Sequence, residues 1–282
     1  MKILKKNPDK ASLSAKKIEK YLTSEDRYKI ICFSSLGSTQ DALKSLAYGD
    51  VPDGQVFIAD RQSGGRGREG RSFFSPADSG IYMSLLLRPS VSAQSLLTKD
   101  TIFITVAAAI SVAEAIEEIT KKKADIKWVN DIIHNGLKVS GILTEAAFNN
   151  NATSYDHVIV GIGINLYKNN FPSELNGIAG ALYNNKPLNV RKLKSRLIAD
   201  ILNRFEFYYG MISYGKFSFI IKYKERSLVI GKKVDIIIGD SVTGCGEVLS
   251  LNDDCSLNIK MENGEIRTLY YGEVRIKLNE QV

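Results

Sequence analysis

Residues 62–76, QSGGRGREGRSFFSP, combine residue types that suit the binding of an anion. Four glycines and three arginines occupy seven of the eight positions from Gly64 to Arg71, and Glu69 occupies the other. Glycine lets backbone N–H groups approach a phosphate, and each arginine presents a planar fork of donors to its oxygens. Fixing glycines costs conformational entropy, and unpaired arginines are almost never buried, so this stretch adds little to a hydrophobic core. We therefore expect this stretch, here called the glycine–arginine loop, to bind a nucleotide or an acyl phosphate.

Gly65, Gly67 and Gly70 of this loop match G-x-G-x-x-G, a fingerprint of dinucleotide-binding and kinase sites. The dinucleotide form requires a helix to begin at the loop, whereas here the chain leads into another apolar strand at 81–87. The sequence also contains no Walker lysine motif. Both interpretations are excluded, and the loop alone leaves a phosphate site and a solvated basic loop as alternatives. Glu69, between the arginines, could pair with one of them while the site is empty.

The composition is that of a globular protein, with 282 residues, 44% hydrophobic and 24% charged. This length favours one large domain with one small one. No apolar run reaches the roughly 18 residues that span a bilayer, and the N-terminus, MKILKKNPDK, lacks the apolar region of a secretory signal. Three widely spaced cysteines indicate neither a disulfide framework nor a zinc site. We expect a reduced, cytoplasmic protein without a membrane partner.

A formal net charge of +7 raises the alternative of a nucleic-acid-binding protein. The charge is concentrated at one end, because residues 1–29 hold nine basic and four acidic side chains, a net charge of +5. A DNA-binding surface needs its basic residues on one face of the folded body. The distribution therefore favours a solvated basic edge over a DNA-binding face.

Apolar periodicity predicts an α+β fold around the loop. Continuous or alternating apolar runs indicate strands, and apolar residues at helical spacing indicate helices. Asn135-Gly136 is a strong signal for the turn of a β-hairpin. The expected strands cover residues 29–33, 55–60, 81–87, 124–128, 131–133, 138–147 and 155–165, and the expected helices cover 14–22, 39–49, 101–120, 191–208 and 214–226.

From about residue 228 the pattern changes to short β runs. Five of them, VDIII, GEVLSL, SLNIKM, EIRTLYY and VRIKL, are separated by turn signals such as Asn263-Gly264. This pattern predicts a small antiparallel barrel of about 50 residues. We expect three parts: a basic helical segment at 1–28, a main domain at 29–227 and the barrel at 228–282.

Five motifs occur in the order in which biotin protein ligases have them: STQ at 38–40, the glycine–arginine loop, KWVND at 127–131, KVSGILTE at 138–145 and GIGIN at 161–165. Each motif is weak alone, but together they make the chain resemble this family over about residues 12–282. The resemblance implies that 29–227 is a catalytic domain of mixed β-sheet with flanking helices, followed by an SH3-like β-barrel. It implies a ligase that converts biotin and MgATP to biotinoyl-5'-AMP. The biotinoyl group would then pass to one lysine of a biotin carboxyl carrier protein domain.

The resemblance implies catalytic roles for three residues. Lys138 would contact the carboxylate of biotin and the α-phosphate of ATP, and would neutralise the charge that develops between them. Arg68 would bind the adenylate. Asp131 would orient Lys138 or help the incoming lysine lose its proton, although a hairpin aspartate could also serve only to cap the turn. No protein metal site is implied, because Mg²⁺ arrives with ATP.

The resemblance also implies two overlapping binding sets. Short hydroxyls and amides would hydrogen-bond the ureido ring of biotin, although Ser38 and Thr39 equally suit helix capping. Gly141 and Gly163 would let the backbone approach the ligand, and Phe73 would stack beside adenine or pack in the core. The biotin set comprises Ser38, Thr39, Gln40, Gln62, Gly65, Arg66, Gly67, Arg68, Lys138, Gly141 and Gly163, and the adenylate set comprises Arg66, Arg68, Arg71, Phe73, Asn130 and Asn165.

Three positions depart from the family pattern, with Gln40 for asparagine, Phe73 for tryptophan and Val129 for proline. They put in doubt the fine hydrogen bonding, the adenine contact and the geometry after the KWVND strand.

Only 28 residues precede the first expected strand, so we expect a monofunctional ligase without specific DNA binding. A lipoate ligase or octanoyl transferase is the main alternative, but its loop is followed by a histidine, which residues 71–120 lack. The chain could form a homodimer.

Overall fold

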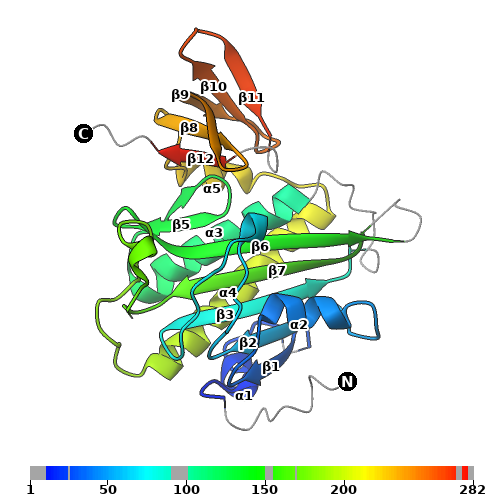
Figure 1. Cartoon of the computed structure of the whole chain (residues 1–282). Coiled ribbons are helices and arrows are strands. Elements are labelled where there is room, and N and C mark those ends of the chain that lie inside the picture. Colours follow the sequence, from blue (N-terminus) through cyan, green and yellow to red (C-terminus); the bar gives the residue numbers. More distant parts are fainter. Residues whose placement is uncertain are drawn as a thin grey trace.

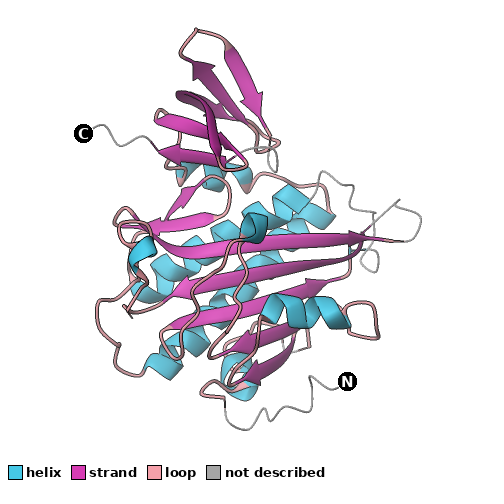
Figure 2. Ribbon diagram, viewed as in Figure 1, coloured by secondary structure: helices cyan, strands magenta, loops and turns pink. Residues whose placement is uncertain are grey.

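A mixed seven-stranded β-sheet forms the body of the molecule (Figures 1 and 2). The computed structural model describes residues 11–24, 26–89, 101–149, 155–168 and 170–270, and the backbone of 275–278. The strands of this sheet are β1 (Lys29–Phe33), β2 (Gln55–Ala59), β3 (Gly80–Leu87), β4 (Asp125–Lys127), β5 (Asp131–His134), β6 (Leu137–Phe148) and β7 (Tyr155–Asn165). Their order is β1-β2-β3-β7-β6-β5-β4, with β1 and β2 parallel and all other neighbours antiparallel.

Helices cover both faces of this sheet, which confirms the expected α+β fold (Figure 1). The helices of the body are α1 (Ala15–Glu19), α2 (Thr39–Leu46), α3 (Thr101–Thr120) and α4 (Val190–Ser213). Helix α3 is buried on most of its circumference between the sheet and α4, as expected of a helix that is apolar nearly all round. Helix α2 is amphipathic and packs Ala42 and Leu43 against Phe57 and Leu86 on the opposite face. The glycine–arginine loop lies on the same face as α2 (Figure 1).

The central hairpin sets the register of the residues expected in the site. Asn135 and Gly136 have φ angles of 50° and 76°, so the turn between β5 and β6 has the left-handed backbone that the Asn-Gly pair predicted. Antiparallel pairing places Asp131 opposite Gly141, and Gly141 opposite Gly163. Three motifs that are separate in the sequence therefore meet on three neighbouring strands.

A second, antiparallel sheet follows α5 (Ile220–Glu225) at one end of the molecule (Figure 1). Its order is β11-β10-β9-β8-β12, which confirms the β-rich C-terminal part. The boundaries between the three expected parts stay predictions, and residues 1–10 lie outside the described residues. The strands are β8 (Lys233–Ile238), β9 (Ser241–Leu251), β10 (Leu257–Met261), β11 (Ile266–Leu269) and β12 (Arg275–Leu278).

Several expected elements differ in length from their apolar patterns. The helix expected at 39–49 ends at Leu46, whereas the helix expected at 191–208 continues to Ser213. The strand expected at 124–128 ends at Lys127, and the chain turns at 128–130. The helix expected at 214–226 begins only at Ile220, because Gly215, with a φ angle of 65°, ends α4 and donates its N–H to the carbonyl of Ile212. The helix expected at 14–22 ends at Glu19 in a turn.

Candidate active site

One cavity of about 1580 Å³ brings together nearly all the side chains that the sequence singled out. It lies between the glycine–arginine loop, strands β5 to β7 and the start of the C-terminal sheet. Of the expected site residues only Gly65 is not in its wall, because it faces Phe73, Ser75 and Gln62 of the loop itself. The expected residues that line it are Ser38, Thr39, Gln40, Gln62, Arg66, Gly67, Arg68, Arg71, Phe73, Asn130, Asp131, Lys138, Gly141, Gly163 and Asn165.

The glycine–arginine loop is folded into a narrow hairpin. The N–H of Phe73 donates to the carbonyl of Gly65 at 2.9 Å, and the N–H of Gly67 donates to the carbonyl of Arg71 at 2.8 Å. The tip is a short 3₁₀ turn in which Gly70 has a φ angle of 73°, a conformation that favours glycine. The loop glycines therefore serve the turn and its close packing as well as any ligand.

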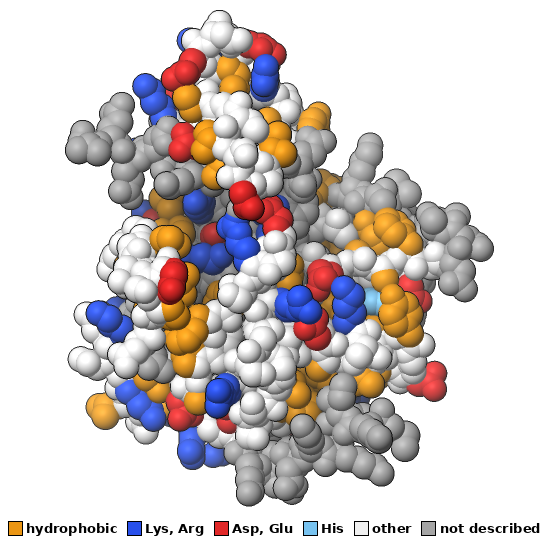
Figure 3. Space-filling model, in the orientation of Figure 1, with side chains coloured by type: hydrophobic (Ala, Val, Ile, Leu, Met, Phe, Trp, Pro, Cys, Tyr) orange, Lys and Arg blue, Asp and Glu red, His pale blue; other side chains and the backbone are white. Residues whose placement is uncertain are grey.

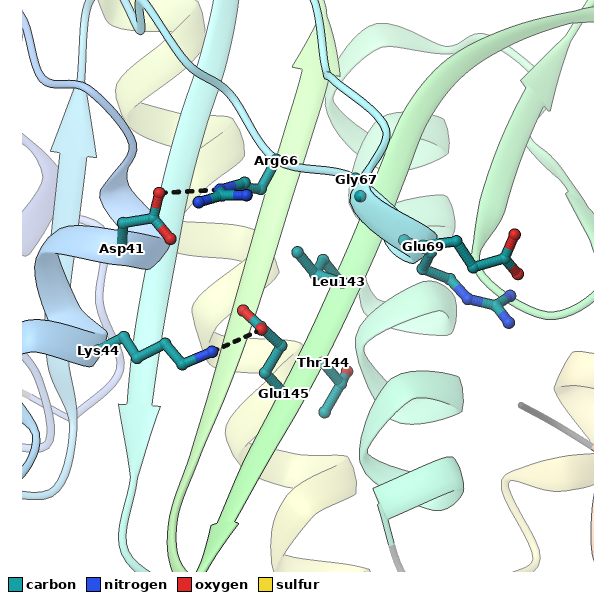
Figure 4. A pocket seen from close by; sticks show the side chains of 10 residues that line it. Asp41, Lys44, Arg66, Gly67, Glu69, Leu143, Thr144 and Glu145 are labelled. Carbon is teal, nitrogen blue, oxygen red and sulfur yellow. Dashed lines mark hydrogen bonds and ion pairs between the residues drawn. The ribbon is translucent and has the colours of Figure 1, made fainter. Parts of the chain in front are cut away.

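Two of the loop arginines are paired with acidic side chains of the chain itself. Arg66 Nε lies 2.9 Å from Asp41 Oδ2 on α2, beside a smaller cavity of about 390 Å³ (Figure 4). Arg71 lies 3.6 Å from Glu69, which is the pairing we expected for an empty site. Nearby carboxylates therefore neutralise these two arginines in this structure.

The two other cations of the site are held by the KWVND motif. Arg68 donates from Nη1 to Asn130 Oδ1 at 3.1 Å, and Lys138 Nζ lies 2.6 Å from Asp131 Oδ1. Asn130 is fixed in turn by β6, since its side chain donates to the carbonyl of Ile142 at 2.6 Å. Asp131 thus contacts the lysine that it was expected to orient.

A chain of hydroxyls and amides, all buried except the half-buried Gln62, forms the floor of the cavity next to α2. Gln62 Oε1 accepts from both the N–H and the hydroxyl of Thr39, whose hydroxyl lies 2.9 Å from Ser84 Oγ. Ser84 donates to Gln40 Oε1 at 3.1 Å. Ser38 caps α2 by accepting from the N–H of Asp41, so its helix-capping role is confirmed. The floor offers both donors and acceptors to a ligand that carries a cyclic urea or an amide.

Gly141 and Gly163 make room for side chains of the protein. A Cβ atom at Gly163 would lie 2.5 Å from Cε1 of Phe73, and one at Gly141 would lie 3.1 Å from Cε of Lys138. The Phe73 ring thus lies against β7 within the cavity wall. We expected ligand atoms to approach these glycines, and in this structure the Phe73 ring and the Lys138 side chain fill that space.

Sequence reasoning missed two parts of the cavity wall. Ser84 is fully buried in β3, where a single hydroxyl in an apolar run was the only signal. The second part is the segment 171–180, which lines the cavity with Phe171, Leu175 and Ile178 and has no periodic pattern. Its backbone pairs with Lys138 on both sides, and Asn165 donates to its Gly180 carbonyl at 3.0 Å. Asn165 therefore supports the wall beside Lys138.

The electrostatics of the cavity favour a polyanion. Lys127, Lys232 and Lys233 join the arginines and Lys138 in its wall, and Figure 3 shows basic side chains in the hollow between the C-terminal sheet and the body. Among the described residues, no group of three or more histidine, cysteine, aspartate or glutamate side chains could hold a metal ion. Within the same part of the chain, no helix is long and apolar enough to span a bilayer.

Comparisons with known proteins agree with the motif order. Residues 32–165 match the model of the biotin/lipoate A/B protein ligase family. The chain is 33% identical over 250 residues to the bifunctional ligase/repressor BirA of Bacillus subtilis, which covers 88% of this chain and 74% of that protein. It is 28% identical to the biotin–[acetyl-CoA-carboxylase] ligase of Mycobacterium tuberculosis, over 74% of this chain and 75% of that one.

Solved structures give the same result for the fold. The chain superposes on the biotin protein ligase from Aquifex aeolicus in complex with biotin and ATP with a TM-score of 0.72 at 28% identity. The match covers 89% of this chain and 99% of that one. This chain belongs to the biotin protein ligase family.

Proposed function

We propose that the chain is an ATP-dependent biotin–protein ligase. It uses MgATP to convert biotin to biotinoyl-5'-AMP with release of pyrophosphate, and then transfers the biotinoyl group to a lysine of a biotin carboxyl carrier domain. The observation that carries this proposal is the cavity itself, in which a floor of hydroxyls and amides adjoins Arg66, Arg68 and Lys138. Such a site fits a ligand with a polar ring at one end and a carboxylate to be joined to a phosphate at the other.

In the first step a carboxylate oxygen of biotin attacks the α-phosphorus of ATP, and the bond to pyrophosphate breaks. Both reacting groups are anions, so the reaction needs cations at the point where they meet. Lys138 and Arg68 supply them; at the cavity wall Lys138 contacts Asp131 and Arg68 donates to Asn130. Mg²⁺ enters with ATP and binds its phosphate oxygens.

In the second step the amine of the carrier lysine attacks the carbonyl carbon of the mixed anhydride, and AMP leaves with the bonding electron pair. The attacking amine must lose a proton. Asp131 is the carboxylate that contacts Lys138 in the cavity wall, and it could accept that proton when Lys138 has turned to the phosphate. The folded glycine–arginine loop covers this part of the cavity and would keep water from the anhydride.

Melting temperatures with biotin, MgATP or both test this proposal. Biotin and MgATP together should raise the melting temperature far more than the sum of their separate effects, because the adenylate that they form binds most tightly. An ATP analogue with a methylene bridge between the α- and β-phosphates should remove the synergy. Lipoate in place of biotin tests the main alternative. Synergy with lipoate but none with biotin would overturn the assignment.

A further inference from the structure

The segment 128–131, which is the turn at 128–130 together with the first residue of β5, holds two cations of the site at once. Its Asn130 binds Arg68 and its Asp131 binds Lys138, at 3.1 Å and 2.6 Å. Any displacement of this turn would therefore move both partners together. What holds the turn in place determines where these two cations lie when the ligands arrive.

Helix α5 holds the turn through one buried hydroxyl. Tyr223 donates from its hydroxyl to the carbonyl of Val129 at 3.0 Å, and both residues are almost wholly buried. Burial raises the pKa of Tyr223 well above its usual value, with Asp131 adding to the shift and Arg68 opposing it. The hydroxyl therefore keeps its proton and remains a donor to the carbonyl of Val129.

The C-terminal sheet holds the same turn through an indole. Trp128 donates from Nε1 to the carbonyl of Cys255 at 2.9 Å, in the connection between β9 and β10. Strand β4, which precedes the turn, pairs with the segment between α5 and β8. The N–H of Ile126 donates to the carbonyl of Arg226, and the N–H of Leu228 donates to the carbonyl of Ile126. The turn is thus attached to residues that follow it by about 90 to 130 positions.

We propose that Tyr223 and Trp128 are positioning residues for the ligase reaction, an inference that rests on the proposed function. Their two hydrogen bonds fix the backbone on the N-terminal side of Asn130. Asn130 and Asp131 then hold Arg68 and Lys138 where biotin's carboxylate attacks the α-phosphorus. Without the tyrosine hydroxyl, the carbonyl of Val129 is left buried without this donor, and the turn shifts to find another. Reacting groups that move by about 1 Å can lose a hundredfold in rate.

Tyr223→Phe tests the inference, and the chain offers a matched control. Tyr28 is also a buried tyrosine that donates to a main-chain carbonyl at 3.0 Å, that of Leu202, and neither residue lines the cavity. Both substitutions remove the same kind of hydrogen bond and should lower the melting temperature by similar amounts. The measurement is kcat and the KM values for biotin and ATP in biotinoyl-AMP formation, well below the melting temperatures.

Tyr223→Phe should lower kcat by about ten- to a hundredfold with the KM for biotin nearly unchanged, whereas Tyr28→Phe should retain the wild-type kcat. Equal kcat values in Tyr223→Phe and wild type, or equal losses in the two variants, would overturn the inference and leave the ligase function standing. A wild-type protein that forms no biotinoyl-AMP would overturn both. If Tyr223→Phe does not fold, Trp128→Phe removes the other hydrogen bond and keeps an aromatic ring, and a wild-type kcat in that variant would overturn the inference.

Discussion

Gly163→Ala is expected to act through the Phe73 ring. The added methyl would lie 2.5, 2.7 and 2.9 Å from three ring carbons, whereas carbon atoms prefer separations of about 3.5–4.0 Å. The ring must therefore move by roughly 1 Å, and overpacking of this size costs about 1–3 kcal/mol of unfolding free energy. Since the ring lies in the cavity wall, its displacement should also raise the KM values for biotin and ATP.

A double-mutant cycle with Phe73→Ala measures this contact. Guanidinium unfolding can be followed by the fluorescence of the single tryptophan. With the ring absent, Gly163→Ala should cost less than about 0.5 kcal/mol, so the two substitutions should be coupled by about 1–3 kcal/mol. Gly210→Ala is the matched control, because Gly210 lies in α4 with no atom near the added methyl, and alanine there should stabilise by about 0.5–1 kcal/mol. An unchanged cost of Gly163→Ala in the Phe73→Ala background would refute the packing argument.

Further substitutions separate the roles of the charged residues. Lys138→Ala should leave the melting temperature nearly unchanged and slow adenylate formation by about a hundred- to a thousandfold in a pyrophosphate-release assay. Arg68→Ala should release free biotinoyl-AMP into solution, detectable by chromatography, and tight retention would contradict its role. Asp41→Asn should free Arg66 from an exposed ion pair and tighten ATP binding by up to about fivefold, as measured by calorimetry. Burial lowers the pKa of Lys194 to about 8, so the unfolded chain binds more protons above that pH. Relative to Lys194→Met, the unfolding free energy of wild type should therefore rise by about 1 kcal/mol per pH unit between pH 8 and 9.5, and equal slopes in the two proteins would contradict this.

The fold followed from local signals where those signals were strong. The Asn135-Gly136 turn and the apolar runs beside it predicted the hairpin, and antiparallel pairing then placed Asp131, Gly141 and Gly163 together. Helix lengths were less predictable. Gly215 ends α4 through a left-handed backbone conformation, and an apolar pattern alone does not show where such a residue will stop a helix.

Motif order predicted most of the cavity wall but few of its internal contacts. The ion pair between Arg66 and Asp41 joins residues that lie 25 positions apart, and nothing in their spacing distinguishes this pair from other charge combinations. The contact of Tyr223 with Val129 spans 94 positions and depends on the packing of α5. Such contacts follow from tertiary packing, so they became visible only in the structure.

Transfer of biotin to a carrier tests the central claim most directly. The wild-type chain and Lys138→Ala would each be incubated with biotin, MgATP and a biotin carboxyl carrier domain, and the carrier would be weighed by intact-protein mass spectrometry. We expect the carrier to gain the mass of one biotinoyl group with the wild-type chain, only when both biotin and MgATP are present, and to gain almost none with Lys138→Ala. An unmodified carrier in the complete wild-type reaction, or equal modification by Lys138→Ala, would contradict the account.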